Sequence, residues 1–195
     1  MNASALREFP VPSPEANDAS DQQLVAAINN GDATAFEALY FRYRDWVVNL
    51  AHRFTGDEDL ALDVMQETFI YLLKKFPGFR LTAQLKTFLY PAVKNLSIAA
   101  RRKAGRLQST QAEQERLSQF PAQEAPPACS TDLSAALHNL SDEHREVLVL
   151  RFVDDLSLAE IAQATSVPLG TVKSRLHNAL ENLRTDERAK EFFAP

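Results

Sequence analysis

The fold of the C-terminal part of this chain is decided by residues 157–176, SLAEIAQATSVPLGTVKSRL. Ser157 and Glu160 have the spacing of a capping box, in which both side chains accept hydrogen bonds from unpaired backbone amides at the start of a helix. This helix must end before Pro168, because the residue that precedes a proline is driven out of helical geometry. Pro168 itself suits the first turn of a second helix, where a missing N–H costs nothing. The stretch therefore predicts a helix-turn-helix, an arrangement that many DNA-binding proteins use.

The second of these helices has the composition of a DNA recognition helix. Its apolar residues recur every three or four positions and are expected to face the core: Val172, Leu176, Ala179 and Leu183. No acid occurs between Ile161 and Leu180, so Lys173 and Arg175 are expected to act on phosphates and base edges without neighbouring carboxylates. The alternative is an ordinary helical pair with solvated cations. The candidate DNA contacts here are Pro168, Gly170, Thr171, Lys173, Ser174, Arg175, His177 and Asn178.

The composition of the whole chain indicates a globular protein whose charge is unevenly distributed. It has 195 residues, a hydrophobic fraction of 45% and a formal net charge of -5. Between Pro77 and Ala112, however, there are seven cations and no acid. The single cysteine, Cys129, excludes an internal disulfide and a multi-cysteine metal site. With no apolar run of membrane-spanning length and no secretion signal, we expect a cytoplasmic chain without membrane insertion.

Helical spacing without any strand pattern predicts an all-α protein: two small helical domains joined by a flexible linker, the second domain a helix-turn-helix. Asp21 and Asp32 can cap the first two helices of the first domain, and residues 55–58 have the spacing of a capping box before a third helix that reaches Phe76. A fourth helix is expected from about Ala83 to Lys103, with a kink near Phe88 because Pro91 removes one backbone hydrogen bond. Helices of the second domain are expected over residues 133–140, 142–152, 157–164 and 168–185. The predicted boundaries are a disordered leader over 1–20, the first domain over 21–105, the linker over 106–131, the second domain over 132–187 and a tail over 188–195.

The predicted helix that ends at Phe76 carries two stripes. The apolar stripe, expected to face the core, holds Leu62, Met65, Phe69, Leu72, Leu73 and Phe76. The second stripe mixes acids with one apolar residue and holds Asp63, Gln66, Glu67, Ile70 and Lys74. It could be a docking surface for another protein or a solvated face without a partner, and spacing alone leaves both interpretations open.

The acid-free stretch that follows interleaves aromatic and basic residues, a mixture suited to single-stranded nucleic acid. Bases stack on aromatic rings, while lysine and arginine contact the phosphates. Phe88 could equally be a core residue, because it has the helical spacing of its apolar neighbours. The candidate nucleic-acid contacts here are Phe79, Arg80, Lys86, Phe88, Lys94, Asn95, Arg101 and Arg102.

An enzyme site has little support in the sequence. Asp63 and Glu67 could hold a hard cation in principle, but no second ligand pair accompanies them. Glycine-rich phosphate loops, nucleophile elbows and zinc-protease motifs are absent. We therefore expect a protein that is not an enzyme and needs no cofactor or metal.

Taken together, these motifs resemble the extracytoplasmic-function (ECF) class of bacterial sigma factors, over roughly Leu24 to Leu183. Residues 63–69, DVMQETF, are similar to the helix with which this family binds core RNA polymerase, and residues 167–176, VPLGTVKSRL, are similar to its minus-35 recognition helix. A dimeric helix-turn-helix regulator that does not join the polymerase is the alternative. Such regulators share the second motif but carry a different upstream domain.

The resemblance implies a partner for each surface. Asp63, Gln66 and Glu67 would dock on the polymerase clamp, the loop around residues 79–84 would capture a flipped minus-10 base, and Phe88, Lys94 and Asn95 would help to separate the strands. It also implies promoter DNA as ligand, an anti-sigma factor as partner and a monomer when free. The chain departs from the family at Phe88, Pro91, Asn178 and Asn182, and the last two replace frequent cations, which predicts weaker minus-35 binding.

Overall fold

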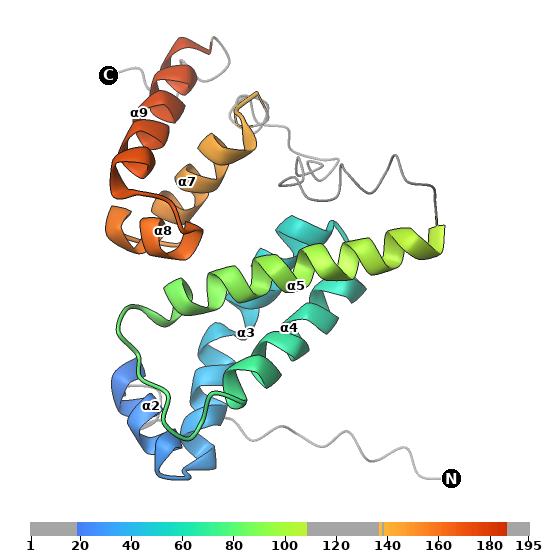
Figure 1. Ribbon diagram of the computed structural model, residues 1–195, viewed down its shortest axis with the longest axis vertical. Coiled ribbons are helices and arrows are strands. Elements are labelled where there is room, and N and C mark those ends of the chain that lie inside the picture. The colour runs from blue at the N-terminus through green and yellow to red at the C-terminus, as the bar shows by residue number, and fades with distance from the viewer. Residues whose placement is uncertain (1–18, 109–136, 138, 187–195) are drawn as a thin grey trace.

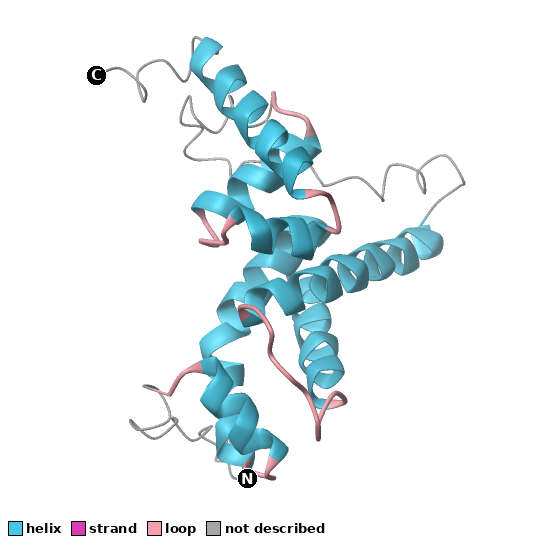
Figure 2. Cartoon of the chain, turned by 60° about the vertical axis from the view of Figure 1, so that its left-hand side comes forward, coloured by secondary structure: helices cyan, strands magenta, loops and turns pink. Residues whose placement is uncertain are grey.

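A computed structural model of the chain describes residues 19–108, 137 and 139–186, and these residues form helices and connecting loops without any strand (Figures 1 and 2). Nearly all of the predicted leader, most of the predicted linker, most of the helix expected over 133–140 and the tail lie outside the described residues. Among the described helices, none combines the length and apolar character needed to cross a bilayer.

The first helical domain consists of α2 (Asp21–Asn29), α3 (Ala33–Thr55), α4 (Glu58–Leu73) and α5 (Leu85–Gln108). α3, α4 and α5 pack against one another, and α2 packs on α3 (Figure 1). The cap of α2 is Ser20, which forms a capping box with Gln23, so the expectation that Asp21 caps this helix is wrong. Asp32 caps α3 as expected.

Residues 55–58 do not form the capping box that their spacing suggested. Thr55 is the last residue of α3, and Gly56 ends that helix in the left-handed region with φ 68°. The residue that caps α4 is Asp57, whose carboxylate accepts from the backbone N–H of Leu60 at 2.8 Å. α5 continues through Pro91 without a break. Because Pro91 lies in its second turn, the lost backbone bond would have gone to a carbonyl near the start of the helix.

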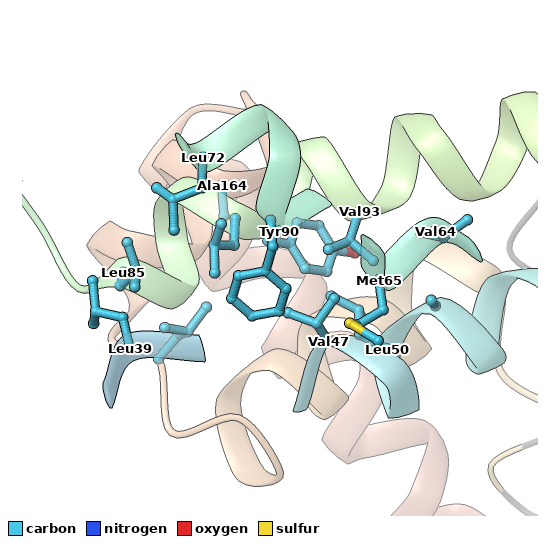
Figure 3. Close-up of a cluster of buried hydrophobic side chains, with 14 of the residues drawn as sticks. Leu39, Val47, Leu50, Val64, Met65, Leu72, Leu85, Tyr90, Val93 and Ala164 are labelled. Atoms are coloured by element: carbon cyan, nitrogen blue, oxygen red, sulfur yellow. The ribbon is translucent and has the colours of Figure 1, made fainter. Parts of the chain in front are cut away.

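The core of the first domain is built from apolar residues of all four helices. Figure 3 shows Tyr90 of α5 beside Val47, Leu50 and Met65 in this core. Each fully buried leucine here stabilises the fold by about 1.5–3 kcal/mol relative to an exposed one. The expected apolar stripe of α4 is partly wrong: Leu62 and Leu73 are 45% and 49% exposed. The residues that α4 buries are Ala61, Val64, Met65, Thr68, Phe69 and Leu72.

The second helical domain consists of α7 (Asp142–Phe152), α8 (Leu158–Thr165) and α9 (Leu169–Thr185). The capping box of Ser157 and Glu160 is present, and α8 and α9 form the predicted helix-turn-helix. Ser166 ends α8 in the left-handed region, which turns the chain between the two helices. Pro168 is the cap residue of α9 with extended backbone, one position before the helix rather than in its first turn.

The two helical domains contact each other. α8 packs against α5, and the group α7 to α9 lies on the side of α5 opposite α4 in Figure 1. Buried residues of the second domain, among them Leu150, Leu156 and Ile161, belong to the same hydrophobic cluster as the core of the first. The order of helices is therefore as predicted, but the second domain is seated on the first.

Candidate polymerase and DNA interfaces

The outer face of α4 is open to solvent over its whole length. All five residues of the second stripe are exposed, and we call them the docking face: Asp63, Gln66, Glu67, Ile70 and Lys74. Ile70 is 51% exposed, and Leu62 and Leu73 expose a similar fraction on the same helix. Large apolar residues exposed together among carboxylates are typical of a surface that another protein covers.

A groove between α4 and α5 adjoins this face. It has a volume of about 270 Å³, and Asp63 and Glu67 lie on one of its walls. The opposite wall is formed by small residues of α5, Ala99, Ala100 and Ala104, with Lys103 beside them. Small side chains on one wall and carboxylates on the other leave room for a side chain of a partner.

The loop between α4 and α5 is fastened by a side chain that the sequence pattern did not single out. Asn29, the last residue of α2, accepts from the backbone N–H of Gly78 at 2.6 Å and donates to the carbonyl of Phe79 at 2.9 Å. Gly78 has φ 100°, a conformation that other residues rarely adopt. The only sequence signal for Asn29 was its place at a helix end, which has many ordinary explanations.

Aromatic rings gather where this loop meets α5. The ring of Phe88 lies between Phe79, at 4.7 Å between centroids, and Tyr71, which is stacked on it at 5.9 Å. Phe76 contacts Phe79 edge-on. Phe79 and Phe88 are half-buried, so Phe88 combines the two roles left open by the sequence: it packs against its neighbours and keeps part of its ring accessible.

The first half of α5 joins α3 in a second surface, which we call the cation-aromatic face: Trp46, Arg53, Lys86, Tyr90 and Lys94. The ammonium of Lys86 lies 5.8 Å from the centroid of the Trp46 ring, and that of Lys94 lies 5.9 Å from the Phe54 ring. Such cation-π contacts hold the lysines against the aromatic surface. Lys86 and Lys94 were predicted from the acid-free stretch, whereas Trp46 and Arg53 come from another helix.

Two carboxylates of the second domain occupy the cation-aromatic face. Asp154 accepts from Trp46 Nε1 at 2.7 Å and from Arg53 Nη1 at 3.3 Å, and its backbone carbonyl accepts from Lys86 Nζ at 3.0 Å. Glu146 accepts from Lys94 Nζ at 2.6 Å and from the Tyr90 hydroxyl. The side chain of Asp154 is 1% exposed and that of Glu146 is 9% exposed. The stretch that is free of acids in the sequence is thus paired with acids in space.

Two pKa shifts accompany this packing. Burial, together with the neighbouring Glu146 carboxylate, raises the pKa of Tyr90 well above that of an ordinary tyrosine. The pKa of Glu160 in α8 is lowered: burial raises it, but hydrogen bonds from Ser157 and from the backbone of Gln84 outweigh that effect. Because Gln84 precedes α5, Glu160 is a third carboxylate of the second domain that contacts the first.

The remaining predicted contacts around α5 are spread along the helix and its loop. Arg80, Asn95 and Arg102 are exposed. Arg101 is half-buried, and burial lowers the pKa of its guanidinium. These residues do not converge with Lys86 and Lys94 on one point, which suits contact with an extended strand more than with a small ligand.

The recognition helix α9 presents most of its predicted residues. Val172, Ala179 and Leu183 are buried as expected, and the exposed ones are Pro168, Gly170, Lys173, Ser174, His177 and Asn178, with Thr171 half-buried. The expectation that the cations of α9 lack neighbouring carboxylates is wrong for Arg175. Its guanidinium pairs with Glu143 of α7 at 2.8 Å, because the fold brings the start of α7 beside α9.

Comparisons with known proteins agree with this layout. Residues 39–107 match the family model of sigma-70 region 2, and residues 136–185 match that of sigma-70, region 4. The chain is 33% identical over 177 residues to the ECF RNA polymerase sigma factor SigW of Bacillus subtilis, which covers 84% of this chain and 95% of that relative. It is 32% identical over 174 residues to the RNA polymerase sigma-H factor of Pseudomonas aeruginosa, covering 83% and 90% of the two chains.

The fold is also similar to that in the structure of CnrH in complex with the cytosolic domain of CnrY, with a TM-score of 0.58, 23% identity and coverage of 83% and 93% of the two chains. A dimeric helix-turn-helix regulator would account for the second domain alone, whereas both sigma-70 regions are matched here in order. This chain therefore belongs to the ECF class of the sigma-70 family, the RNA polymerase sigma factors that act in transcription initiation.

Proposed function

We propose that this sigma factor docks on core RNA polymerase through the docking face of α4, while its α4–α5 loop and α5 bind the minus-10 element and α9 binds the minus-35 element. It acts in the cytoplasm beside the polymerase, which makes the RNA; the sigma factor itself selects the start site and helps to open the strands. No step of this function requires catalysis by the chain.

The observation that carries the docking assignment is the exposure of Ile70 one turn after Glu67, on a helix whose other side is packed. A solvated face has no need of three exposed large apolar residues, Leu62, Ile70 and Leu73. The groove beside Asp63 and Glu67 gives a partner helix a second wall to contact. Together these features favour a protein partner over solvent.

The minus-10 assignment is supported by the loop and its aromatic cluster. Asn29 fixes the backbone at Gly78 and Phe79, so the loop is ordered before DNA arrives. A base extruded from the duplex costs a few kcal/mol, which stacking and pocket contacts offset. The half-buried rings of Phe79 and Phe88 offer surfaces for such stacking.

The minus-35 assignment is supported by the exposed polar face of α9. Lys173, Ser174 and Asn178 lie on the side of α9 that is not packed on α7 and α8, as a helix in the major groove requires. With Arg175 engaged by Glu143, this helix has little free positive charge. Its contribution to affinity therefore depends on the polymerase holding both domains at fixed spacing.

A regulatory partner is a further part of the proposal. The similar structure of CnrH holds the cytosolic domain of CnrY, and the similar sigma factor RpoE of Bartonella quintana was solved with the anti-sigma factor NepR. An anti-sigma factor that covers the docking face would keep this chain, a monomer when free, from the polymerase.

The experiment that tests the docking assignment is co-purification of the chain with core RNA polymerase. Glu67→Lys reverses a charge on the docking face and is expected to weaken association by at least tenfold, equivalent to about 1.4 kcal/mol. Glu37→Lys makes the same change at an exposed position of α3 and is the matched control. Equal recovery of the two variants would contradict the assignment.

A further inference from the structure

We propose that Tyr71 and Lys75, at the C-terminal end of α4, bind the single strand that is displaced when the minus-10 element opens. The ring of Tyr71 extends the stacking surface of Phe88, and the ammonium of Lys75 binds a phosphate of the same strand. This inference rests on the minus-10 role proposed above for Phe79 and Phe88. It gives the end of α4, whose outer face is the docking face for the polymerase, a second role in DNA binding.

Four aromatic rings form a continuous row where α4, the following loop and α5 meet. Tyr71 of α4 is stacked on Phe88 of α5 at 5.9 Å between centroids, with 15° between the ring planes. Phe88 contacts Phe79 of the loop at 4.7 Å, and Phe79 contacts Phe76 at 5.5 Å. Tyr71 is 38% exposed, whereas the other three are half-buried. Because bases stack on aromatic rings with little regard to sequence, the row offers its most accessible stacking surface at Tyr71.

The polar groups at Tyr71 are available to a ligand. In the described part of the chain, the Tyr71 hydroxyl forms no hydrogen bond and Lys75 pairs with no carboxylate. Lys75 Nζ lies 4.5 Å from the centroid of the Tyr71 ring. A cation-π contact at an exposed ring is weak, so the ammonium can exchange it for a phosphate oxygen. A phenol hydroxyl and an ammonium beside one ring thus form a site for the phosphate next to a stacked base.

The charge around this site favours DNA over another protein. No acid occurs between Thr68 and Ala112, so the acid-free stretch includes the last turn of α4 as well as the loop and α5. Within it, Lys75 and Arg80 flank the row of rings in sequence, and Arg80 is exposed. A polyanion is attracted to such a surface, whereas the docking face, with its two carboxylates, is suited to a basic partner.

The face of α5 that carries Phe88 gives the strand a path to the rings. Phe88, Asn95 and Arg102 are seven residues apart, which is close to two helical turns, so they lie in line along one face of α5. Asn95 and Arg102 are exposed. Lys86 and Lys94, which contact the second domain, are turned from Phe88 by about 160° and 120° around the helix. The second domain therefore packs on another side of α5 and leaves the Phe88 face open to a strand.

The first test identifies what Tyr71 touches in the complex of the full chain with core polymerase and a promoter. A photoreactive benzoyl-phenylalanine in place of Tyr71 is expected to cross-link to the non-template strand within the minus-10 element. The same group in place of His52, an exposed residue of α3, is the control and is expected not to reach DNA. Tyr71 lies one turn after Glu67 of the docking face, so a cross-link to a polymerase subunit in place of DNA would overturn the inference. Absence of any cross-link would overturn it as well.

The second test measures the affinity of the same complex for the labelled non-template strand of that promoter. Tyr71→Ala removes the ring and is expected to weaken binding at least about fivefold, whereas Tyr71→Phe keeps the ring and should lose less. Lys75→Gln is expected to flatten the slope of log affinity against log salt concentration by about 0.7, as the loss of one phosphate contact requires. Arg44→Gln removes one partly exposed cation of α3 and is the charge-matched control. Unchanged affinity of Tyr71→Ala, or equal slopes for Lys75→Gln and Arg44→Gln, would overturn the inference.

The failure of this inference can be told apart from failure of the proposed minus-10 role. If that role is wrong, Phe79→Ala will leave the affinity of the polymerase complex for the non-template strand unchanged. If only the role of the end of α4 is wrong, Phe79→Ala will weaken this affinity, whereas Tyr71→Ala and Lys75→Gln will bind like the unmodified chain. Weaker association of Tyr71→Ala with core polymerase would assign the ring to the docking face and overturn the inference.

Discussion

The docking face of α4 and the cation-aromatic face of α3 and α5 belong to the same helical domain, yet one is exposed and the other is covered. Their charges explain the difference. The docking face carries Asp63 and Glu67, and the side of the second domain that meets the first carries acids as well, Glu146 and Asp154. An acidic surface repels that side, whereas the cations of α5 attract it. The comparison teaches that charge decides which face of the first domain the second domain covers.

The largest expected effect is a difference in the free energy of unfolding between substitutions on the two faces. Arg53→Ala would leave the buried carboxylate of Asp154 without its guanidinium, and breaking a buried ion pair in this way costs about 3–5 kcal/mol. Glu67→Ala, on the exposed docking face, is expected to change the free energy of unfolding by less than about 0.5 kcal/mol. Urea unfolding of both variants gives the comparison. Similar values would mean that the domains do not pack as described.

A smaller effect is expected from the hydroxyl of Tyr90. Tyr90→Phe removes a buried donor to Glu146 and should lower stability by about 1–3 kcal/mol. Tyr71→Phe is the control, because the Tyr71 ring is 38% exposed. Loss of the Tyr71 hydroxyl is expected to leave the unfolding midpoint unchanged, and an equal loss in both variants would count against the contact with Glu146.

The raised pKa of Tyr90 also predicts a pH dependence. In the unfolded chain this phenol loses its proton near the ordinary value of about 10, whereas in the folded chain it keeps the proton to higher pH. The stability from this group is therefore complete below pH 10 and is lost as the pH rises above it. Urea unfolding of the unmodified chain and of Tyr90→Phe across this range should show a shallower alkaline decline in the variant. Parallel curves would contradict the assignment.

The loop between α4 and α5 gives a prediction that separates promoter opening from association with the polymerase. Asn29→Asp replaces the amide that donates to the Phe79 carbonyl with a carboxylate, and the expected loss of loop order is about 1–2 kcal/mol. Promoter opening should fall several-fold, while association with core polymerase stays the same. Asn30→Asp, at the exposed neighbouring position, is the control. Normal promoter opening by Asn29→Asp would show that the hydrogen bonds between Asn29 and the α4–α5 loop have no role in minus-10 binding.

The smallest effect concerns the recognition helix. Glu143→Gln releases Arg175 from a partly exposed ion pair, which is worth about 0.2–1 kcal/mol. Binding of the full chain in its polymerase complex to minus-35 duplex should become slightly tighter and more sensitive to salt. Glu181→Gln, which disrupts an exposed pair with Arg184 on the same helix, should have no such effect. A weaker complex with Glu143→Gln would indicate that the pair positions Arg175 for DNA.

Local patterns in the sequence were enough to predict most helices. The capping box at Ser157 and the cap at Asp32 depend on residues two or three positions apart, so the sequence alone predicts them, whereas the spacing over residues 55–58 pointed to Thr55 instead of Asp57 as the cap of α4. The five residues of the docking face follow from the period of a single helix. The expectation that Leu62 and Leu73 of α4 face the core was wrong because helical spacing alone does not say how wide the packed stripe of a helix is.

The covered face could not be predicted in the same way. Trp46 and Asp154 are 108 residues apart, and Arg53 and Asp154 are 101 apart. A charge count along the chain describes neighbours in sequence, so it found the cations between Pro77 and Ala112 and missed the acids that pair with them. The same reason explains the pairing of Arg175 with Glu143.

The central claim is that the second helical domain packs on the first in the free chain, through Asp154 and Glu146. Single-molecule energy transfer between dyes at Glu37→Cys and Glu181→Cys, in a chain with Cys129→Ser, measures the distance between the two helical domains directly. We predict high transfer in the free chain, lower transfer in the complex with polymerase and promoter, and reduced transfer in the free chain carrying Glu146→Gln and Asp154→Asn. Equal transfer in all three samples would contradict the claim.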